Sequence, residues 1–317
     1  MIADAASGLR LAVLVPCFNE EHAVADVVAG FRRALPGATV YVYDNNSTDR
    51  TVEVAQAAGA IVRREPRQGK GHVVRRMFAD VDADVFVLVD GDDTYDAGAA
   101  PVLVAKLLDE RLDFVNAARV STGIEAYRRG HRFGNWLLSS LVRVIFGREF
   151  RDMLSGYKVL SRRFVKSFPA MARGFETETE LAVHALELRM PSTEIPTAYK
   201  ERPQGSASKL RTYRDGARIL LLIARLVKDE RPLQFFGTLG LVLVGVAVTL
   251  SVPLAVTYAE TGLVPRIPTA ILTVGLVLLG MLSFVSGLIL DMTTRTRQEI
   301  KRLFYLAIPR WERNREG

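Results

Sequence analysis

A cluster of carboxylates follows an apolar run in the first third of the chain. The run Val85-Phe86-Val87-Leu88-Val89 has the pattern of a buried strand, and Asp90-Gly91-Asp92-Asp93 comes directly after it. Mg²⁺ and Mn²⁺ prefer oxygen ligands and often share them with substrate phosphates. The pattern therefore predicts a metal and diphosphate site at Asp90 to Asp93. The alternative is an acidic turn that caps the next helix.

Short apolar runs alternate with helical patterns through the region that contains this cluster. Strands are expected over residues 11–15, 39–43, 60–63, 85–89 and 114–117, and helices over residues 21–35 and 51–58, from residue 71, and over 99–108. This alternation predicts βαβ units and an α/β fold with a mostly parallel, doubly wound sheet. Ligands of such sheets bind beyond the carboxyl ends of the strands.

Polar residues occupy the expected ends of two further strands. The first strand ends at Pro16-Cys17-Phe18-Asn19-Glu20, and the second ends at Asp44-Asn45-Asn46-Ser47-Thr48-Asp49. Some of these side chains can cap the helices that follow. Capping does not explain acidic residues at two separate strand ends, so we expect the polar ends to converge on one site.

A lysine between two glycines precedes the third expected helix. Gly69-Lys70-Gly71 lacks the spacing and the Ser or Thr of a P-loop, and no Gly-x-Gly-x-x-Gly follows the first strand, which argues against P-loop NTPases and dinucleotide oxidoreductases. Amides at a helix start and one ammonium group can still contact a diphosphate; an ordinary turn is the alternative. Arginine suits bidentate phosphate recognition, and the later loops contain Arg119, Arg128, Arg129, Arg132, Arg151, Arg202 and Arg211.

Two long stretches near the C-terminus contain no Asp, Glu, Lys or Arg. Residues 235–258 and 269–290 each exceed the roughly 20 apolar residues that cross a bilayer as a helix. Two core helices of a soluble protein are the alternative. Lysine and arginine flank the pair on both sides, so the positive-inside rule predicts a hairpin of the cytoplasmic membrane, with both termini and the preceding domain in the cytoplasm. Residues 209–228 have the pattern of a basic amphipathic helix at the membrane surface.

Composition narrows the partners of the chain. The 317 residues carry a formal charge of +7, but the excess lies beside the apolar stretches and among the later arginines, so anionic lipid is a simpler partner than nucleic acid. The single Cys17 excludes an internal disulfide framework. The N-terminal residues do not indicate a cleavable signal peptide. The four histidines lack the spacing of a metal site, and we expect no catalytic role for them.

Taken in order, these motifs resemble those of the family 2 glycosyltransferases with a GT-A fold. The resemblance rests on Val15 to Glu20, Asp44 to Thr51, Gly69-Lys70-Gly71 and Asp90 to Asp93. Three later segments resemble the polyprenyl-phosphate branch, which includes dolichyl-phosphate mannose synthase. These segments are Asp152-Met153-Leu154-Ser155-Gly156-Tyr157, Gly174-Phe175-Glu176-Thr177-Glu178-Thr179-Glu180 and Arg202-Pro203-Gln204-Gly205-Ser206-Ala207-Ser208-Lys209. The resemblance covers residues 10–215 and the hairpin.

The resemblance implies a role for individual residues. A nucleotide sugar, with UDP or GDP undetermined, would be bound by Pro16, Asn19, Glu20, Asp44, Asn45, Ser47, Lys70, Asp90, Gly91, Asp92 and Lys209. Mg²⁺ or Mn²⁺ would be held by Asp90 and Asp92. Relatives commonly have Gln two places after the second Asp, where this chain has Thr94, so the third ligand stays open between Asp93 and Thr94. Catalytic roles are implied for Asp90, Asp92, Arg119, Arg132, Asp152 and Arg202. For Asp152, a helix cap is the alternative.

The implied reaction is the inverting transfer of a sugar from a nucleotide diphosphate sugar to a polyprenyl monophosphate. Two alternatives remain: transfer to a hydroxyl acceptor, and a non-catalytic scaffold that retained a nucleotide-sugar fold. The expected organisation is a catalytic domain over residues 1–208, an interfacial helix over 209–232, a hairpin over 233–291 and a basic tail over 292–317. The resemblance also permits a homo-oligomer formed through the hairpins.

Overall fold

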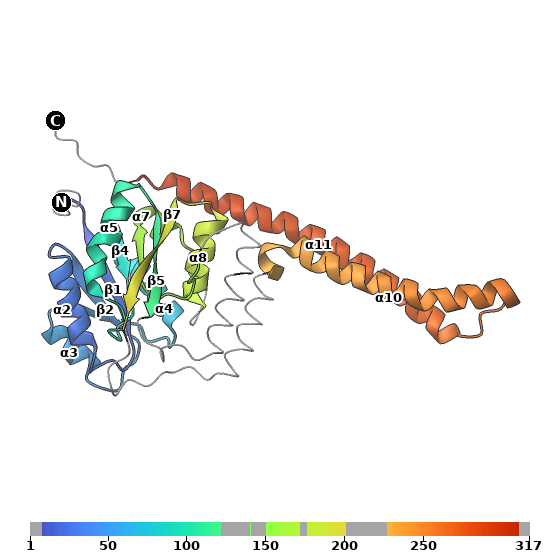
Figure 1. Cartoon of the computed structure of the whole chain (residues 1–317), viewed down its shortest axis with the longest axis horizontal. Coiled ribbons are helices and arrows are strands. Elements are labelled where there is room, and N and C mark those ends of the chain that lie inside the picture. Colours follow the sequence, from blue (N-terminus) through green and yellow to red (C-terminus); the bar gives the residue numbers. More distant parts are fainter. Residues whose placement is uncertain (1–7, 122–139, 141–149, 172–175, 201–226, 311–317) are drawn as a thin grey trace. The chain divides into compact units, whose positions relative to one another are not determined.

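The computed structural model describes residues 8–121, 140, 150–171, 176–200 and 227–310. Within these ranges the chain forms a seven-stranded sheet with the order β3-β2-β1-β4-β6-β5-β7 (Figure 1). The strands are β1 (Leu11–Cys17), β2 (Thr39–Asp44), β3 (Ile61–Arg64), β4 (Val85–Leu88), β5 (Phe114–Ser121), β6 (Lys158–Ser161) and β7 (Ser192–Tyr199). Only β6 runs antiparallel to its neighbours, so the expected mostly parallel α/β sheet is confirmed.

Helices cover both faces of this sheet. They are α2 (Val24–Ala34), α3 (Thr51–Ala57), α4 (Lys70–Asp80), α5 (Ala100–Asp109), α7 (Arg162–Ser167) and α8 (Thr177–Glu187). In β1, Val13 and Val15 pack into the core cluster with residues of α2 and α5. In β4, Phe86 points the other way and contacts Phe78 of α4 edge to face. Because both faces are covered here, β1 and β4 are apolar runs without polar alternation.

Two strands of the sheet were not among the expected elements. The four-residue β6 and the eight-residue β7 lie in stretches to which the sequence pattern assigned no strand. β7 pairs in parallel with β5 at the edge of the sheet, and it contains Pro196, which an edge strand tolerates. These two strands place Lys158 and Glu194 beside β5, where neither was expected.

The C-terminal region contains two long apolar helices, α10 (Pro232–Thr261) and α11 (Ile267–Ala307), which are long and apolar enough to cross a membrane. Both expected spans lie inside them. The chain separates into two compact units, residues 1–219 with 301–317 and residues 220–300. Within the second unit α10 and α11 pack closely at Gly240. A Cβ added there would lie 2.7 Å from the carbonyl oxygen of Gly280. The interfacial helix expected over residues 209–228 lies almost wholly outside the described residues.

Candidate active site

The loops after β1 and β2 are tied together at the carboxyl edge of the sheet. Asn19 adopts a left-handed backbone with φ of 54°. Its backbone N–H donates to the Ser47 hydroxyl oxygen at 2.9 Å, and its side-chain oxygen accepts from the N–H of Thr48 at 2.8 Å. The N–H of Glu20 donates to the Thr51 hydroxyl at 2.9 Å. The structure therefore brings together the predicted base- and ribose-binding residues of the two strands.

Asn45 joins the second strand end to the loop that contains Lys70. Its side-chain amide donates to the carbonyl oxygens of Glu65 and Arg67, and its side-chain oxygen accepts from the N–H of Gly69 at 2.7 Å. Asp44, which is buried, accepts from the N–H of Ser47 at 3.1 Å. The side chain of Asn45 thus fixes the loop before α4, and its predicted contact with the donor stays a prediction.

Lys70 is the first residue of α4 and forms ion pairs with both Asp90 and Glu178. Burial by itself would lower the pKa of Lys70, but the two carboxylates outweigh burial and raise that pKa, so the ammonium group stays charged. α8 begins at Thr177 and has Glu178 and Glu180 in its first turn. Glu178 is in addition a buried partner of Lys70, which only the three-dimensional structure reveals.

Two glycines allow backbone segments to approach this centre closely. A Cβ added at Gly156 would lie 2.1 Å from Oδ2 of Asp90, and a Cβ added at Gly91 would lie 2.5 Å from Sγ of Cys17. The segment Asp152 to Tyr157 is therefore in contact with the acidic end of β4. Gly91 also brings β4 against the end of β1, as expected for converging strand ends.

The acidic residues after β4 differ in their surroundings. Asp92 is buried and accepts a hydrogen bond from the Thr94 hydroxyl at 2.6 Å. Asp93 has a positive φ of 52° and lies 3.8 Å from the ammonium group of Lys200. Burial raises the pKa of Asp93, against an opposing effect of Lys200. The assignment of Asp90, Asp92 and Asp93 as metal ligands stays a prediction.

The donor groups here fit a divalent metal that is shared with a substrate. Among the described residues, no group of three or more acidic, histidine or cysteine side chains is arranged to hold a metal on its own. Mg²⁺ in phosphate-transfer sites is commonly bound by one or two carboxylates together with substrate phosphates. Asp90 and Asp92 offer hard oxygen donors of this kind, so they fit a metal on a diphosphate better than a site built only from protein.

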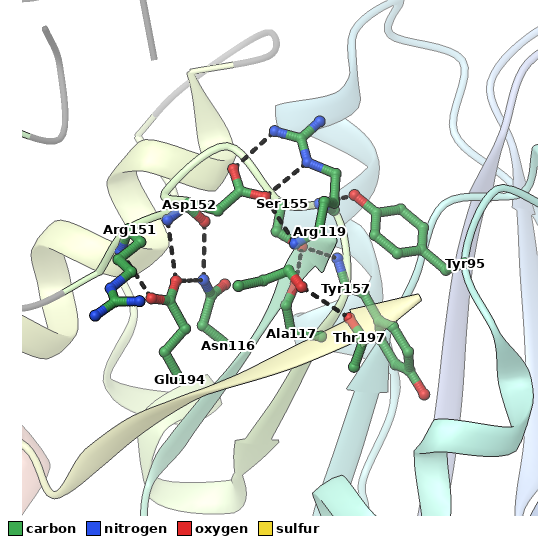
Figure 2. Close-up of polar contacts among 12 residues, drawn as sticks. Tyr95, Asn116, Ala117, Arg119, Arg151, Asp152, Ser155, Tyr157, Glu194 and Thr197 are labelled. Atoms are coloured by element: carbon green, nitrogen blue, oxygen red, sulfur yellow. Dashed lines mark hydrogen bonds and ion pairs between the residues drawn. The ribbon is translucent and has the colours of Figure 1, made fainter. Parts of the chain in front are cut away.

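A second charged group lies at the end of β5, where Arg119 and Asp152 form a two-point ion pair (Figure 2). Nε and Nη2 of Arg119 donate to the two carboxylate oxygens of Asp152, each at 2.7 Å, and the N–H of Arg119 adds a bond at 3.1 Å. Burial alone would raise the pKa of Asp152, but the bonds from Arg119 outweigh burial and lower that pKa. Asp152 is therefore ionised at neutral pH, and within the described residues no helix begins directly after it.

Aromatic residues connect this ion pair to the acidic end of β4. The guanidinium of Arg119 lies over the ring of Tyr199, which contacts Tyr95 edge to face. The hydroxyl of Tyr95 accepts a hydrogen bond from the N–H of Gly156 at 2.7 Å. Gly156 in turn contacts Asp90. The described residues thus form one continuous site, to which Tyr95 and Tyr199 belong although the sequence pattern did not indicate them.

Part of the predicted site lies outside the described residues. The three positions are Arg132, Arg202 and Lys209. They were expected to contact the acceptor phosphate or the donor diphosphate, and these roles stay predictions. Of the implied cationic residues, the structure describes Lys70 and Arg119.

Residues 12–168 match the profile of glycosyl transferase family 2. Glycosyltransferase AglJ of Haloferax volcanii is 31% identical over 293 residues, covering 92% of this chain and 96% of the relative. A dolichyl-phosphate hexose transferase of the same organism is 29% identical over 221 residues, covering 70% of this chain and 95% of the relative.

A solved structure supports the same assignment. Glucosyl-3-phosphoglycerate synthase from Mycobacterium tuberculosis, in complex with Mn²⁺, UDP-glucose and phosphoglyceric acid, superposes with a TM-score of 0.59 and 25% identity, covering 72% of this chain and 81% of that one. The fold and the site define a nucleotide-sugar glycosyltransferase of the GT-A type. The chain belongs to glycosyltransferase family 2.

Proposed function

We propose that the protein transfers a sugar from a nucleotide diphosphate sugar to a polyprenyl monophosphate, with inversion at the anomeric carbon. The observation that carries the proposal is that a family 2 glycosyltransferase unit shares its chain with two helices apolar enough to cross a membrane. A polyprenyl phosphate keeps its chain in the bilayer and its phosphate at the surface. The similarity to a dolichyl-phosphate hexose transferase supports the same class of acceptor.

Asp90 and Asp92 are the residues that would hold Mg²⁺ or Mn²⁺ on the donor diphosphate. Once bound, the metal would neutralise the charge that develops on the leaving nucleotide diphosphate. Lys70 contributes a fixed positive charge beside Asp90. Asp92 and Glu178 add further carboxyl groups, so acidic side chains outnumber the one lysine and favour binding of a cation.

On the acceptor side, the proposed chemistry needs orientation more than proton removal. A phosphate monoester has a second pKa of about 6, so the attacking oxygen is already anionic at neutral pH. The planar guanidinium of Arg119 matches phosphate geometry, and Asp152 fixes its orientation through two bonds of 2.7 Å. Asp152 therefore acts by holding Arg119 in place, and the transfer gains rate from positioning and charge stabilisation.

The apolar helices would place this chemistry at the cytoplasmic face of the membrane. Their large apolar side chains are mostly exposed, as expected for helices that contact lipid. Arg295, Arg297, Lys301 and Arg302 follow the second apolar stretch and belong to α11, which extends to Ala307. Basic residues at this position favour a cytoplasmic side and contact with anionic lipid.

The proposal is tested by a donor screen. The full-length protein in lipid nanodiscs is incubated with Mn²⁺, undecaprenyl phosphate and a panel of UDP- and GDP-sugars, and lipid products are identified by mass spectrometry. The proposal predicts one or more glycosylated polyprenyl phosphates. Parallel reactions contain free polyprenol and phosphoglycerate as hydroxyl acceptors. Transfer to a hydroxyl acceptor and to no polyprenyl phosphate would overturn the assignment of the acceptor.

A further inference from the structure

Three polar residues lie side by side across three adjacent strands beneath the Arg119–Asp152 pair. In the sheet register, Asn116 of β5 is opposite Lys158 of β6 on one side and Glu194 of β7 on the other. Asn116 and Lys158 are fully buried, and Glu194 is half-buried. Burying a charged lysine destabilises the fold unless other groups bond to its ammonium, because burial disfavours the charged form.

Hydrogen bonds run from Lys158 to Asn116 and from Asn116 to Glu194, and Figure 2 shows the bonds of Asn116 and Glu194. The Lys158 ammonium donates to the side-chain oxygen of Asn116 at 2.6 Å. This bond fixes the amide orientation, so the Asn116 NH₂ group donates to Oε1 of Glu194 at 2.9 Å and to the carbonyl oxygen of Asp152 at 2.8 Å. Lys158 is also linked to the Asp152 backbone through Asn116, which bonds to both residues.

Glu194 completes the support of the Asp152 backbone. Its Oε1 accepts from the N–H of Asp152 at 3.0 Å, and its Oε2 accepts from the N–H of Arg151 at 2.7 Å. Both carboxylate oxygens are therefore engaged by successive amides of one loop. A carboxylate accepts with both oxygens, whereas a glutamine side chain would present an NH₂ group to one of these two N–H donors.

We infer that Glu194 is a positioning residue for the acceptor phosphate. It holds the backbone of Arg151 and Asp152 so that the Asp152 carboxylate meets Arg119 with both oxygens, and Asn116 and Lys158 hold Glu194 in turn. The inference rests on the proposed role of Arg119 in binding an anionic acceptor. Glu194 touches neither substrate in this account and acts only through the Asp152–Arg119 pair.

The test is a double-mutant cycle of Glu194→Gln and Arg119→Ala on the KM for undecaprenyl phosphate. In the wild-type background, Glu194→Gln raises the acceptor KM about tenfold and leaves the donor KM within about twofold, because Glu194 bonds the amides of Arg151 and Asp152, whereas the loop meets Asp90 on the donor side at Gly156. In the Arg119→Ala background, Glu194→Gln adds no further change. Glu110→Gln, on the exposed end of α5, is the matched control and leaves both constants unchanged.

Three results would overturn the inference: equal changes in both KM values, an undiminished effect of Glu194→Gln without Arg119, or a wild-type acceptor KM in a folded Glu194→Gln protein. If thermal unfolding shows that Glu194→Gln is not folded, Glu194→Asp replaces it in the cycle. The shorter aspartate side chain cannot reach both amides. If the wild type transfers only to a hydroxyl acceptor, the proposed function fails, and the same cycle on the KM for that acceptor decides the role of Glu194.

Discussion

Gly156→Ala places a methyl group against Asp90 without touching the charge of the site. The added Cβ would lie 2.1 Å from Oδ2 and 2.6 Å from Cγ of Asp90, whereas Cβ contacts under 3.0 Å are essentially never observed. The carboxylate must therefore move by at least about 0.9 Å from its position beside Lys70. A displacement of about 1 Å in a catalytic constellation can cost about 100-fold in rate.

We expect kcat/KM for transfer to fall about 100-fold, which corresponds to about 2.7 kcal/mol of transition-state stabilisation. The free energy of unfolding should change little, because the group that gives way is the end of a side chain that is 30% exposed. Initial rates measure the first effect, and thermal unfolding measures the second. Electron paramagnetic resonance of Mn²⁺ in the presence of the nucleotide reports whether the metal is still bound.

Gly37→Ala is the matched control, because an added Cβ there meets nothing within 4 Å. It should keep the rate and the metal affinity of the wild type. The reasoning is refuted if folded Gly156→Ala transfers sugar and binds Mn²⁺ as well as the control does.

Three further predictions concern charged residues of the same unit. Lys70→Met removes the cation from Asp90, so Mn²⁺ alone should bind about tenfold more tightly by titration calorimetry, while transfer becomes slower; unchanged binding would argue against Lys70 as the partner of Asp90. Burial lowers the pKa of Lys158 from 10.5 to about 8, so the charged lysine destabilises the fold by about 3 kcal/mol below pH 8, and this cost disappears as the pH rises to 10.5. The Tm of Lys158→Met should therefore exceed the wild-type Tm below pH 8, and the difference should shrink between pH 8 and 10.5. A difference in Tm that stays constant over this range would contradict the prediction. Asp92→Asn should abolish transfer, and thermal unfolding should show that the variant is still folded. Wild-type rates would rule out a metal-binding role for Asp92.

Much of the fold could be predicted because burial and secondary structure leave a local signal. The runs that became β1, β2 and β4 are largely apolar over consecutive residues, and β5 begins with Phe114-Val115 before the polar Asn116. Each of the four was expected within a few residues of its observed bounds. β7 was missed because its sequence, Ser192 to Tyr199, is polar and contains a proline. Such a strand forms only because β5 offers it an edge, and this is a property of the sheet rather than of the segment.

The sequence indicates candidate site residues most directly where they follow a strand, whereas Lys70 was expected from its flanking glycines, and Arg119 and Asp152 from the family resemblance. Asp90, Asp44 and Asn19 belong to motifs at strand ends, and their types alone suggested a ligand site. The pairing of Lys70 with Glu178 joins α4 to α8, and the alignment of Lys158, Asn116 and Glu194 depends on the register of three strands. Neither pattern has a periodicity or a spacing that a single sequence can show.

The central claim is that the sugar is attached to the phosphate of a lipid acceptor at an inverted anomeric carbon. The most direct measurement is ³¹P and ¹³C NMR of the purified product formed from undecaprenyl phosphate and the productive donor. The account predicts a phosphodiester whose phosphorus couples to the anomeric carbon, with a configuration opposite to that of the donor. A product that retains the donor configuration, or that has a sugar on a hydroxyl group and a free phosphate monoester, would contradict it.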